Sequence, residues 1–490
     1  MNVLLLYPEF PDTFWSFKHA LKFIDKKAGT PPLGLLTIAA MLPQNWSFRL
    51  VDTNIQPLKQ KDIDWADWIL ISAMVVQRDS AHELIERCKA SGKTIIAGGP
   101  LFTSEHEQFP LVDHFILNEG EITLPLFLTD WVQGTPQRVY QTEEYADITA
   151  TPSPRWELAD LKQYATVSVQ FSRGCPFNCE FCNVTALLGH RPRTKTAAQF
   201  IAELDSLYAL GWRDPVFIVD DNFIGNKKVI KQELLPALMN WRKGKHGLPF
   251  NTEVSINLAD DAELMELMIA AGFNEVFVGI ETPNEDSLVE CNKKQNRNRD
   301  LIASVTRIQQ AGIIVQGGFI VGFDSDSENI FDQQAAFIRD AGITTAMVGL
   351  LQAPAGTRLY ERMVQEGRLL EEISGDNADG TTNIIPKLDA KFLKNGYRQL
   401  VKYLYHPKQY YQRCLTLLKT IKPPKIQKAI DVSYIRAYFR TIYVLGIKGT
   451  ERFEYWKLVG WTLLHKPKLF PLAITLAIYG YHFRVLANRV

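Results

Sequence analysis

The chain has 490 residues, of which 46% are apolar, so it can bury large cores, and its length corresponds to about three domains. Its six cysteines, three of them in one short run, do not form a disulfide framework and indicate a reducing compartment. The formal charges cancel, but residues 401–490 hold 16 Lys and Arg against 3 Asp and Glu, a net charge of +13 that the first 400 residues balance. This basic, aromatic-rich tail predicts a separate module with its own partner.

Up to about residue 150, short apolar runs alternate with helical patterns. The first run lacks the basic leader and the cleavage site of a signal peptide, so we expect a cytoplasmic protein. The alternation predicts an α/β fold that begins with a flavodoxin-like, doubly wound parallel sheet, which binds ligands at the carboxyl ends of its strands. The expected strands are residues 3–7, 48–52, 68–72, 94–98 and 114–117, with helices at 32–42 and 80–91.

Two turns at these strand ends are candidates for ligand binding. Ser72 opens a Ser-Ala-Met turn after the third strand, and Gly98 and Gly99 follow the fourth. A glycine pair lets a flat ligand approach the backbone, although a tight turn without a ligand explains it equally well. The loop after the first strand, residues 8–19, is rich in aromatic side chains and ends at His19.

Between about residues 165 and 355, six strand candidates recur with helices between them. They are residues 167–171, 216–219, 252–256, 275–279, 317–321 and 347–351. This pattern predicts a partial (β/α)6 barrel, whose chemistry lies at the carboxyl ends of its strands. Polar or glycine residues near these ends are Asp220, Asp221, Asn222, Glu281, Gly318 and Gly322. For each single carboxylate, a helix cap after the strand is the alternative interpretation.

A run of cysteines follows the first of these six strands. Cys175, Cys179 and Cys182 are spaced C-x3-C-x2-C, and Phe181 directly precedes the third cysteine. Three thiolates this close can bind one 4Fe-4S iron–sulfur cluster and leave one iron open for a substrate or cosubstrate. The alternatives are three free thiols in a loop or a zinc site, for which His190 is the nearest fourth ligand.

This motif resembles that of the radical S-adenosylmethionine superfamily. The flavodoxin-like region before it resembles the cobalamin-binding domain of the cobalamin-dependent members, in which the positions of Ser72, Gly98 and Gly99 line the groove for the nucleotide tail. The Asp-x-His-x-x-Gly loop that donates a histidine to cobalt is absent. The resemblance therefore implies cobalamin without a lower histidine ligand, and an aromatic loop that covers the corrin; His19 as a ligand is the alternative.

The same resemblance assigns roles to the other strand ends. Asp220, Asp221 and Asn222 occupy the place that contacts the amino group of S-adenosylmethionine, although the usual sequence there is Gly-Gly-Glu. Glu281 would accept the ribose hydroxyls, and the strand from Gly318 to Gly322 would pack beside the adenine. The implied cofactors are a 4Fe-4S cluster, S-adenosyl-L-methionine and cobalamin, and the implied electron donor is a reductase, flavodoxin or ferredoxin.

The implied reaction is cleavage of S-adenosylmethionine to a 5′-deoxyadenosyl radical, followed by methylation of an unactivated carbon in a small-molecule substrate. One alternative is a radical enzyme without cobalamin that rearranges or cyclises its substrate. A non-enzyme alternative is an iron–sulfur sensor or scaffold. The expected division is a cobalamin-binding-like domain at residues 1–150, a radical barrel at 160–358 and a basic helical domain at 359–490.

The C-terminal region is expected to be helical, at residues 390–405, 408–421 and 426–444. The apolar segment 469–483 contains Pro471 and is shorter than the roughly 20 residues of a membrane span. Its basic and aromatic flanks suit peripheral contact with an anionic inner membrane, and a lid on the barrel is the alternative. The region shows no RNA-reading motif, and we expect no nucleic-acid partner. It resembles the extension of the bacterial subgroup that includes the hopanoid C-2 methyltransferase. The charge of the tail and its aromatic and apolar content suggest a hydrophobic or membrane-associated substrate, such as a polycyclic terpenoid lipid.

Overall fold

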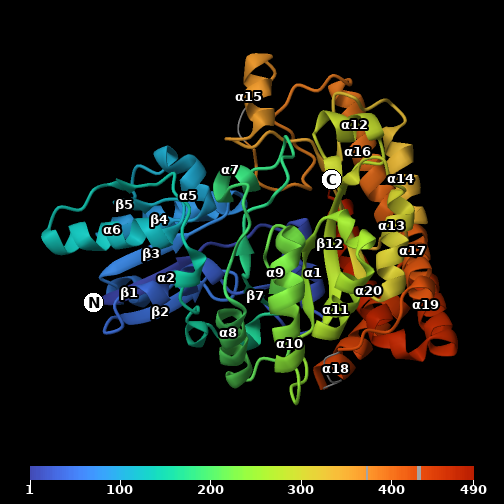
Figure 1. Cartoon of the computed structure of the whole chain (residues 1–490), viewed down its shortest axis with the longest axis horizontal. Coiled ribbons are helices and arrows are strands. Elements are labelled where there is room, and N and C mark those ends of the chain that lie inside the picture. The colour runs from blue at the N-terminus through green and yellow to red at the C-terminus, as the bar shows by residue number, and fades with distance from the viewer. Residues whose placement is uncertain (371–372, 427–431, 490) are drawn as a thin grey trace.

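The computed structural model of the chain describes residues 1–370, 373–426 and 432–489. Figure 1 shows a first sheet at the left, a second sheet in the centre, and C-terminal helices stacked along the right side of the second sheet. Both large sheets contain six parallel strands. The α/β fold that the alternating pattern predicted is confirmed.

The first sheet has the strand order β2-β1-β3-β4-β5-β6. Val3 to Leu6 of β1 are fully buried, because apolar clusters cover both faces of the sheet. The sheet is therefore doubly wound, as predicted. Its strands are β1 (Asn2–Tyr7), β2 (Ser47–Asp52), β3 (Trp68–Ser72), β4 (Thr94–Gly98), β5 (His114–Ile116) and β6 (Val139–Tyr140), and its helices are α1 (Lys18–Leu21), α2 (Leu33–Met41), α3 (Gln60–Trp65), α4 (Arg78–Ala90), α5 (Pro100–Glu105) and α6 (Gly120–Gln133).

The second sheet has the order β14-β13-β12-β11-β10-β7, and its edge strands β14 and β7 are not paired with each other. It is the predicted partial barrel, with its helices outside. Its strands are β7 (Val167–Val169), β10 (Val216–Ile218), β11 (Phe250–Val254), β12 (Phe273–Glu281), β13 (Ile314–Val321) and β14 (Ala346–Leu350). Its helices are α7 (Val184–Leu188), α8 (Ala197–Ala209), α9 (Lys227–Val229), the π-helical turn Ile230–Leu234, α10 (Leu235–Trp241), α11 (Ala262–Ala271), α12 (Glu285–Glu290), α13 (Leu301–Ala311), α14 (Ile330–Asp340) and α15 (Arg358–Gln365).

The C-terminal helices share one continuous apolar core with the barrel. Buried Arg413 strengthens this junction, since its guanidinium donates to the carbonyl oxygens of Ile343 and Leu404 at 2.9 and 2.8 Å. The tail is thus built onto the barrel, as the lid alternative predicted. Its helices are α16 (Ala390–Tyr405), α17 (Pro407–Thr420), α18 (Val432–Thr441), which continues as the π-helix Ile442–Lys448, α19 (Arg452–His465) and α20 (Phe470–Ala487).

The tail departs from the sequence expectations at α18 and at its last apolar segment. The helix expected over residues 426–444 begins at Val432 in the described chain, Ile426 is not helical, and residues 427–431 lie outside the described residues. The segment Pro467–Ala487 has the length and hydropathy of a membrane span, but half of it is buried inside the molecule. It packs against α1, α16, α17 and α19, as a core helix does.

Candidate functional site

The cysteine loop lies at the carboxyl end of β7, between the short antiparallel strands β8 (Ser172–Arg173) and β9 (Arg193–Thr194). Gly174 has a φ of +94°, and a Cβ atom there would lie 2.9 Å from two carbonyl oxygens of the returning chain, so only glycine fits. The thiols are free, and Cys179 lies close enough to act electrostatically on both Cys175 and Cys182. The structure therefore brings Cys175, Cys179 and Cys182 together, and their role as cluster ligands stays a prediction.

Three polar side chains surround these thiols. Asn222 Nδ2 lies 3.9 Å from Cys175 Sγ, and Gln295 Nε2 lies 3.8 Å from Cys179 Sγ. Lys293 pairs with Glu281 at 2.6 Å; burial disfavours its charge, but the Glu281 carboxylate raises the pKa of Lys293 above its usual value.

These donors fit a negatively charged iron–sulfur cluster, which takes thiolate ligands and is tuned by hydrogen bonds and charges at its sulfurs. Burial raises the pKa of Cys182 to about 12, so a thiolate at this position requires a metal partner or a cation. Within the described ranges, no three His, Cys, Asp or Glu side chains are grouped to hold a single metal ion.

The three residues after β10 have different surroundings. Asp220 is fully buried and accepts hydrogen bonds from Phe171 N at 2.8 Å and Ser172 Oγ at 2.6 Å, so it fastens the start of the cysteine loop. Asn222 faces Cys175 and accepts from Ser255 N at 3.2 Å. Burial raises the pKa of Asp221 to about 6, and within the described ranges its carboxylate accepts a hydrogen bond only from its own backbone N–H. Of the two carboxylates, Asp221 is therefore the one available to a ligand.

Glu281 closes β12 in an unusual backbone conformation. Its φ is +64°, in the region that favours glycine, and the pairing with β13 shifts register just before it. Such strain is of order 1–2 kcal/mol and clusters at functional sites. Gly318 leaves room for the ring of Phe277, which would lie 2.7 Å from an added Cβ, and Gly322 has a φ of +101°. Packing and turn geometry explain both glycines, and their place beside an adenine stays a prediction.

The inner face of the barrel carries polar groups that have few partners. Glu253 has no hydrogen bond among the described residues, and burial, helped by Asp221, raises its pKa to about 8. Asn251 Oδ1, on the same strand as Glu253, is buried without a partner in the described structure. Gln316 Nε2 on β13 donates to Glu275 on β12 at 2.6 Å. Because buried polar groups are normally hydrogen-bonded, these side chains are candidates for contact with the polar atoms of a ligand.

Replacing Glu253 with glutamine should make thermal stability less sensitive to alkaline pH. The carboxyl has a pKa of 4.5 when exposed and about 8 when folded, so the folded state holds a proton that the unfolded state releases between these values. The stability contribution of Glu253 therefore falls as pH rises and is lost above about pH 8. Since glutamine does not titrate, the melting temperature of Glu253→Gln relative to the natural protein should rise from about pH 6 to about pH 9. Equal rises in Glu266→Gln, at an exposed position of α11, would contradict this assignment.

Ser72, Gly98 and Gly99 meet at the carboxyl edge of the first sheet. Ser72 pairs in register with Gly98, and a Cβ atom on Gly99, whose φ is +93°, would lie 2.5 Å from Ser72 Oγ. The glycines are thus needed by the turn itself, as the tight-turn alternative states. Ser72 Oγ has no hydrogen-bond partner in the described part of the chain. A flat backbone surface with one free hydroxyl fits the polar tail of a nucleotide cofactor.

The aromatic loop after β1 reaches from the first sheet to the barrel. Trp15 Nε1 lies 3.1 Å from Met347 Sδ, and the Trp15 ring meets the edge of Phe277 at 5.4 Å. The loop therefore covers the inner face of β12 and β14 with apolar surface. His19 lies 3.4 Å from Asp12 and 3.4 Å from Arg489, and these contacts account for it without a role as a cobalt ligand.

Two ion pairs join the carboxyl edge of the first sheet to the cysteine loop. Arg193 forms a two-pronged pair with Glu119 at 2.6 and 2.8 Å, and Arg173 forms one with Glu121 at 2.7 and 3.1 Å. Burial opposes the charge of Glu121, but Arg173 lowers its pKa below the usual value. Largely buried, bidentate pairs of this kind fix orientation. The two candidate cofactor sites are therefore held face to face.

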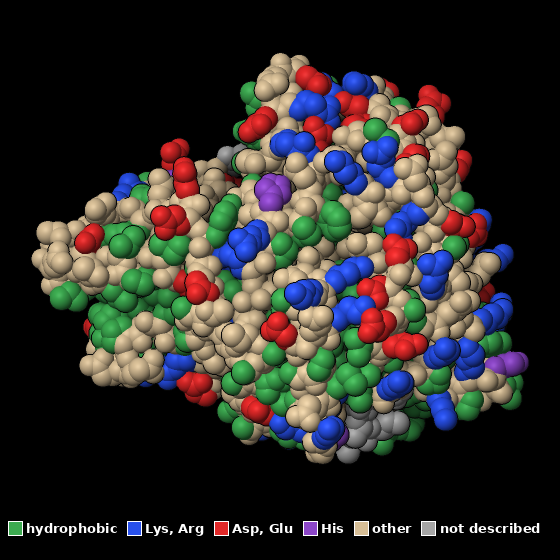
Figure 2. Space-filling model, in the orientation of Figure 1, with side chains coloured by type: hydrophobic (Ala, Val, Ile, Leu, Met, Phe, Trp, Pro, Cys, Tyr) green, Lys and Arg blue, Asp and Glu red, His purple; other side chains and the backbone are tan. Residues whose placement is uncertain are grey.

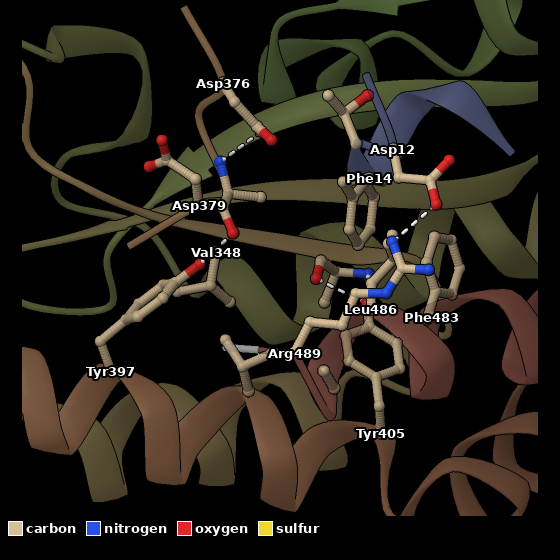
Figure 3. A pocket seen from close by; sticks show the side chains of 15 residues that line it. Asp12, Phe14, Val348, Asp376, Asp379, Tyr397, Tyr405, Phe483, Leu486 and Arg489 are labelled. Carbon is tan, nitrogen blue, oxygen red and sulfur yellow. Dashed lines mark hydrogen bonds and ion pairs between the residues drawn. The ribbon is translucent and has the colours of Figure 1, made fainter. Parts of the chain in front are cut away.

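A cavity of about 200 Å³ lies elsewhere, on the outer side of β14 between the aromatic loop, α16 and α20 (Figure 3). Figure 3 shows Phe14, Tyr405 and Phe483 along one wall. At its rim, Arg489 bonds Asp12 at 2.6 Å. Because Met347 and Trp15 occupy the opposite face of the same strand, this cavity is separate from the barrel interior.

The sequence interpretation missed Lys293, Gln295 and Glu253. Lys293 and Gln295 belong to an irregular segment after α12, where no periodicity indicates which side chains face the cysteines. Glu253 had a usable signal, because Asn251 and Glu253 alternate with Phe250, Thr252 and Val254, the residues that a barrel strand turns toward its covering helices. Polar side chains at every second position of such a strand point into the barrel.

Comparison with known proteins gives matches along most of the chain. Three family models match, for the B12 binding domain (residues 27–128), the Radical SAM superfamily (residues 169–338) and a domain of unknown function, DUF4070 (residues 357–490). The chain is 43% identical to the uncharacterized methyltransferase sll1242 of Synechocystis sp., over 99% of this chain and 91% of that protein. It is 34% identical to the hopanoid C-2 methylase of Rhodopseudomonas palustris, over 93% and 88% of the two chains.

Solved structures show a similar fold. The cobalamin-dependent S-adenosylmethionine radical enzyme OxsB superimposes with a TM-score of 0.64 at 14% identity, over all of this chain and 80% of that one. The methyltransferase TsrM of Kitasatospora setae, with cobalamin and a [4Fe-4S] cluster bound, gives a TM-score of 0.57 at 15% identity over 74% and 75% of the chains.

Proposed function

This chain belongs to the family of cobalamin-dependent radical S-adenosylmethionine methyltransferases that includes the hopanoid C-2 methylase, and from this premise we propose that its substrate is a hydrophobic small molecule. The observation that carries the use of both cofactors in one reaction is the position of two sites, the cysteine loop and the glycine turn of the first sheet, which the Arg193–Glu119 and Arg173–Glu121 pairs join. Residues 1–150, 160–358 and 359–490 would act as the cobalamin, radical and tail units.

When bound, the cluster and S-adenosylmethionine supply a 5′-deoxyadenosyl radical, and cobalamin supplies the methyl group. In this proposal Cys175, Cys179 and Cys182 hold the cluster, and Lys293 offsets its negative charge. Ser72, Gly98 and Gly99 receive the nucleotide tail of cobalamin. Trp15 and Phe277 would cover the inner face of the barrel with apolar surface and so exclude water beside the reacting groups.

The two carboxylates after β10 are proposed to have different roles: Asp221 binds a ligand, and Asp220 stabilises the cysteine loop. Asp221 would accept the ammonium hydrogens of S-adenosylmethionine, with Glu281 near the ribose and the strand from Gly318 to Gly322 beside the adenine. Asp220 would act through the loop it fastens, because both its oxygens already accept hydrogen bonds.

The paired variants Asp221→Ala and Asp220→Ala should therefore behave differently. Asp221→Ala should raise the KM for S-adenosylmethionine about tenfold with an unchanged melting temperature, because a charge-assisted hydrogen bond is lost. Asp220→Ala should lower the free energy of unfolding by about 1–3 kcal/mol, because it leaves Phe171 N and Ser172 Oγ unpaired. Kinetics of 5′-deoxyadenosine formation measure the first effect, and thermal melts measure the second. A raised KM in Asp220→Ala together with a lowered stability in Asp221→Ala would assign the ammonium contact to Asp220.

The proposed substrate class follows from the tail and from the hopanoid C-2 methylase. We infer a polycyclic terpenoid lipid or a molecule of similar apolar character, a cytoplasmic enzyme in peripheral contact with the inner membrane, and a reductase, flavodoxin or ferredoxin as electron donor. Glu253, Glu275 and Gln316 would contact the few polar atoms of such a substrate.

The test starts from a strain that lacks the gene. Its lipid extract and its polar extract are incubated separately and anaerobically with the reconstituted enzyme, a reductant, hydroxocobalamin and S-adenosylmethionine carrying a deuterated methyl group. We expect one lipid that is missing from the deletion strain to reappear with the labelled methyl group on carbon. Labelling only in the polar extract would overturn the hydrophobic-substrate proposal.

A further inference from the structure

Large apolar side chains are exposed along α18, the π-helix that follows it, and α19. Phe453 is 75% and Leu464 82% exposed, and the other six members range from 44% to 63%. We call this surface the α18–α19 face; it comprises Ile435, Phe439, Tyr443, Ile447, Phe453, Trp456, Leu463 and Leu464. Exposed apolar clusters of this kind mark an interaction surface.

The periodicity of α18 shows that this exposure is not a by-product of packing. Ile435, Phe439, Tyr443 and Ile447 recur every four residues on the outside. Ala437 and Leu445, on the other side of the same helical stretch, are buried in the molecule. A helix with apolar side chains on both sides is stable when both sides are buried, and here the rest of the protein buries only one side.

Basic side chains surround the face. Between residues 434 and 470 there are seven Lys and Arg against two Asp and Glu, and one of the acids, Glu451, is buried and paired with Arg484 at 2.7 Å. Lys448 lies 4.5 Å from the Tyr443 ring, and Arg452 lies 5.0 Å from the Phe453 ring. Aromatic and aliphatic side chains rimmed by cations match the headgroup region of an anionic bilayer.

The orientation of the molecule is compatible with this partner. In Figure 1, α18 lies below the barrel and α19 at its lower right, whereas α7, which follows the cysteine loop, lies in the upper half of the molecule. Figure 2 shows Lys and Arg side chains gathered at the right of the same view. Docking through the α18–α19 face would therefore leave the cysteine loop accessible to an electron donor.

We propose that the α18–α19 face docks on an anionic lipid bilayer, with α18 and α19 lying in the headgroup plane and α20 remaining in the protein core. This inference deepens the proposed hydrophobic substrate, because it places the enzyme where such molecules dissolve. It does not depend on catalysis, so vesicle binding and methyl transfer can fail separately.

The test is co-sedimentation of the full, cluster-reconstituted chain with vesicles of phosphatidylcholine alone or mixed with phosphatidylglycerol. We expect binding to the mixed vesicles that weakens at high salt, since screening shortens electrostatic reach to a few ångströms. The triple variant Phe439→Ser, Phe453→Ser, Leu464→Ser should bind at least about tenfold more weakly. The variant Lys448→Gln, Arg452→Gln, Lys457→Gln should lose the preference for anionic vesicles, about fivefold for each charge.

The matched control replaces three apolar residues exposed elsewhere, Leu126→Ser, Val132→Ser and Val364→Ser, and should bind like the natural protein. Iron content and 5′-deoxyadenosine formation report that every variant is folded. The proposal is overturned if the natural chain ignores anionic vesicles at low salt, or if both triple-serine variants bind equally. It is also overturned if the α18–α19 variants instead abolish a dimer seen by light scattering, which would make the face a contact between two copies.

Discussion

Replacing Cys175, Cys179 or Cys182 with alanine should abolish iron binding and the formation of 5′-deoxyadenosine completely. The three thiols lie together at the carboxyl end of β7, and among them Cys179 is buried, so water cannot substitute for a missing sulfur ligand without opening the loop. Anaerobic reconstitution followed by iron analysis should give about four irons per natural chain and a broad absorption near 400 nm, and neither in the variants.

The control for these variants is Cys414→Ala. Cys414 is fully buried in α17, far along the chain from the cysteine loop. The Cys414→Ala protein should keep its iron, and it should lose some stability because the substitution leaves a small cavity. An alanine variant of the loop that retains four irons would show that the cluster is bound elsewhere. Zinc in place of iron in the natural chain would contradict the assignment as well.

The second large effect is expected from Lys293→Met. This ammonium is 12% exposed, pairs with the 8% exposed Glu281, and acts on the three thiols. Removing it leaves a buried carboxylate unpaired, which costs about 3–5 kcal/mol. It also removes the positive charge beside the cluster, so the reduction potential should shift to more negative values and activity should fall about 10- to 100-fold.

Lys294→Met is the matched control, because Lys294 is adjacent in sequence but exposed. It should leave the potential, the iron content and the melting temperature unchanged. A potentiometric titration followed by electron paramagnetic resonance measures the reduction potential of the cluster in both variants and in the natural protein. An unshifted potential in Lys293→Met would mean that this ammonium serves only to pair with Glu281.

Much of the fold follows from local sequence signals. Buried parallel strands such as β1 and β3 are continuous apolar runs, so their positions are confirmed to within a residue or two. The cysteine spacing places three thiols on one short loop whatever the surroundings. The Ser72, Gly98 and Gly99 turns are equally local, since they need only the neighbouring strands β3 and β4.

Side-chain direction and long-range pairing are harder to predict. Asp220 and Asp221 are adjacent in sequence and chemically identical, yet one bonds the cysteine loop and the other is available, because successive residues point to opposite sides. Lys293 reaches Glu281 across an irregular segment, and Arg193 reaches Glu119 in another part of the chain. Such contacts depend on tertiary placement, which periodicity does not encode.

The central claim, that one site combines the cluster with cobalamin, is tested most directly by cofactor retention. The reconstituted chain is incubated with hydroxocobalamin under anaerobic conditions, desalted, and analysed for iron and for the corrin spectrum. We predict about four irons and about one corrin per chain, with the corrin but not the iron lost in Gly99→Val, whose side chain would collide with Ser72. Retention of iron without any corrin in the natural chain would contradict the account and favour a radical enzyme that works without cobalamin.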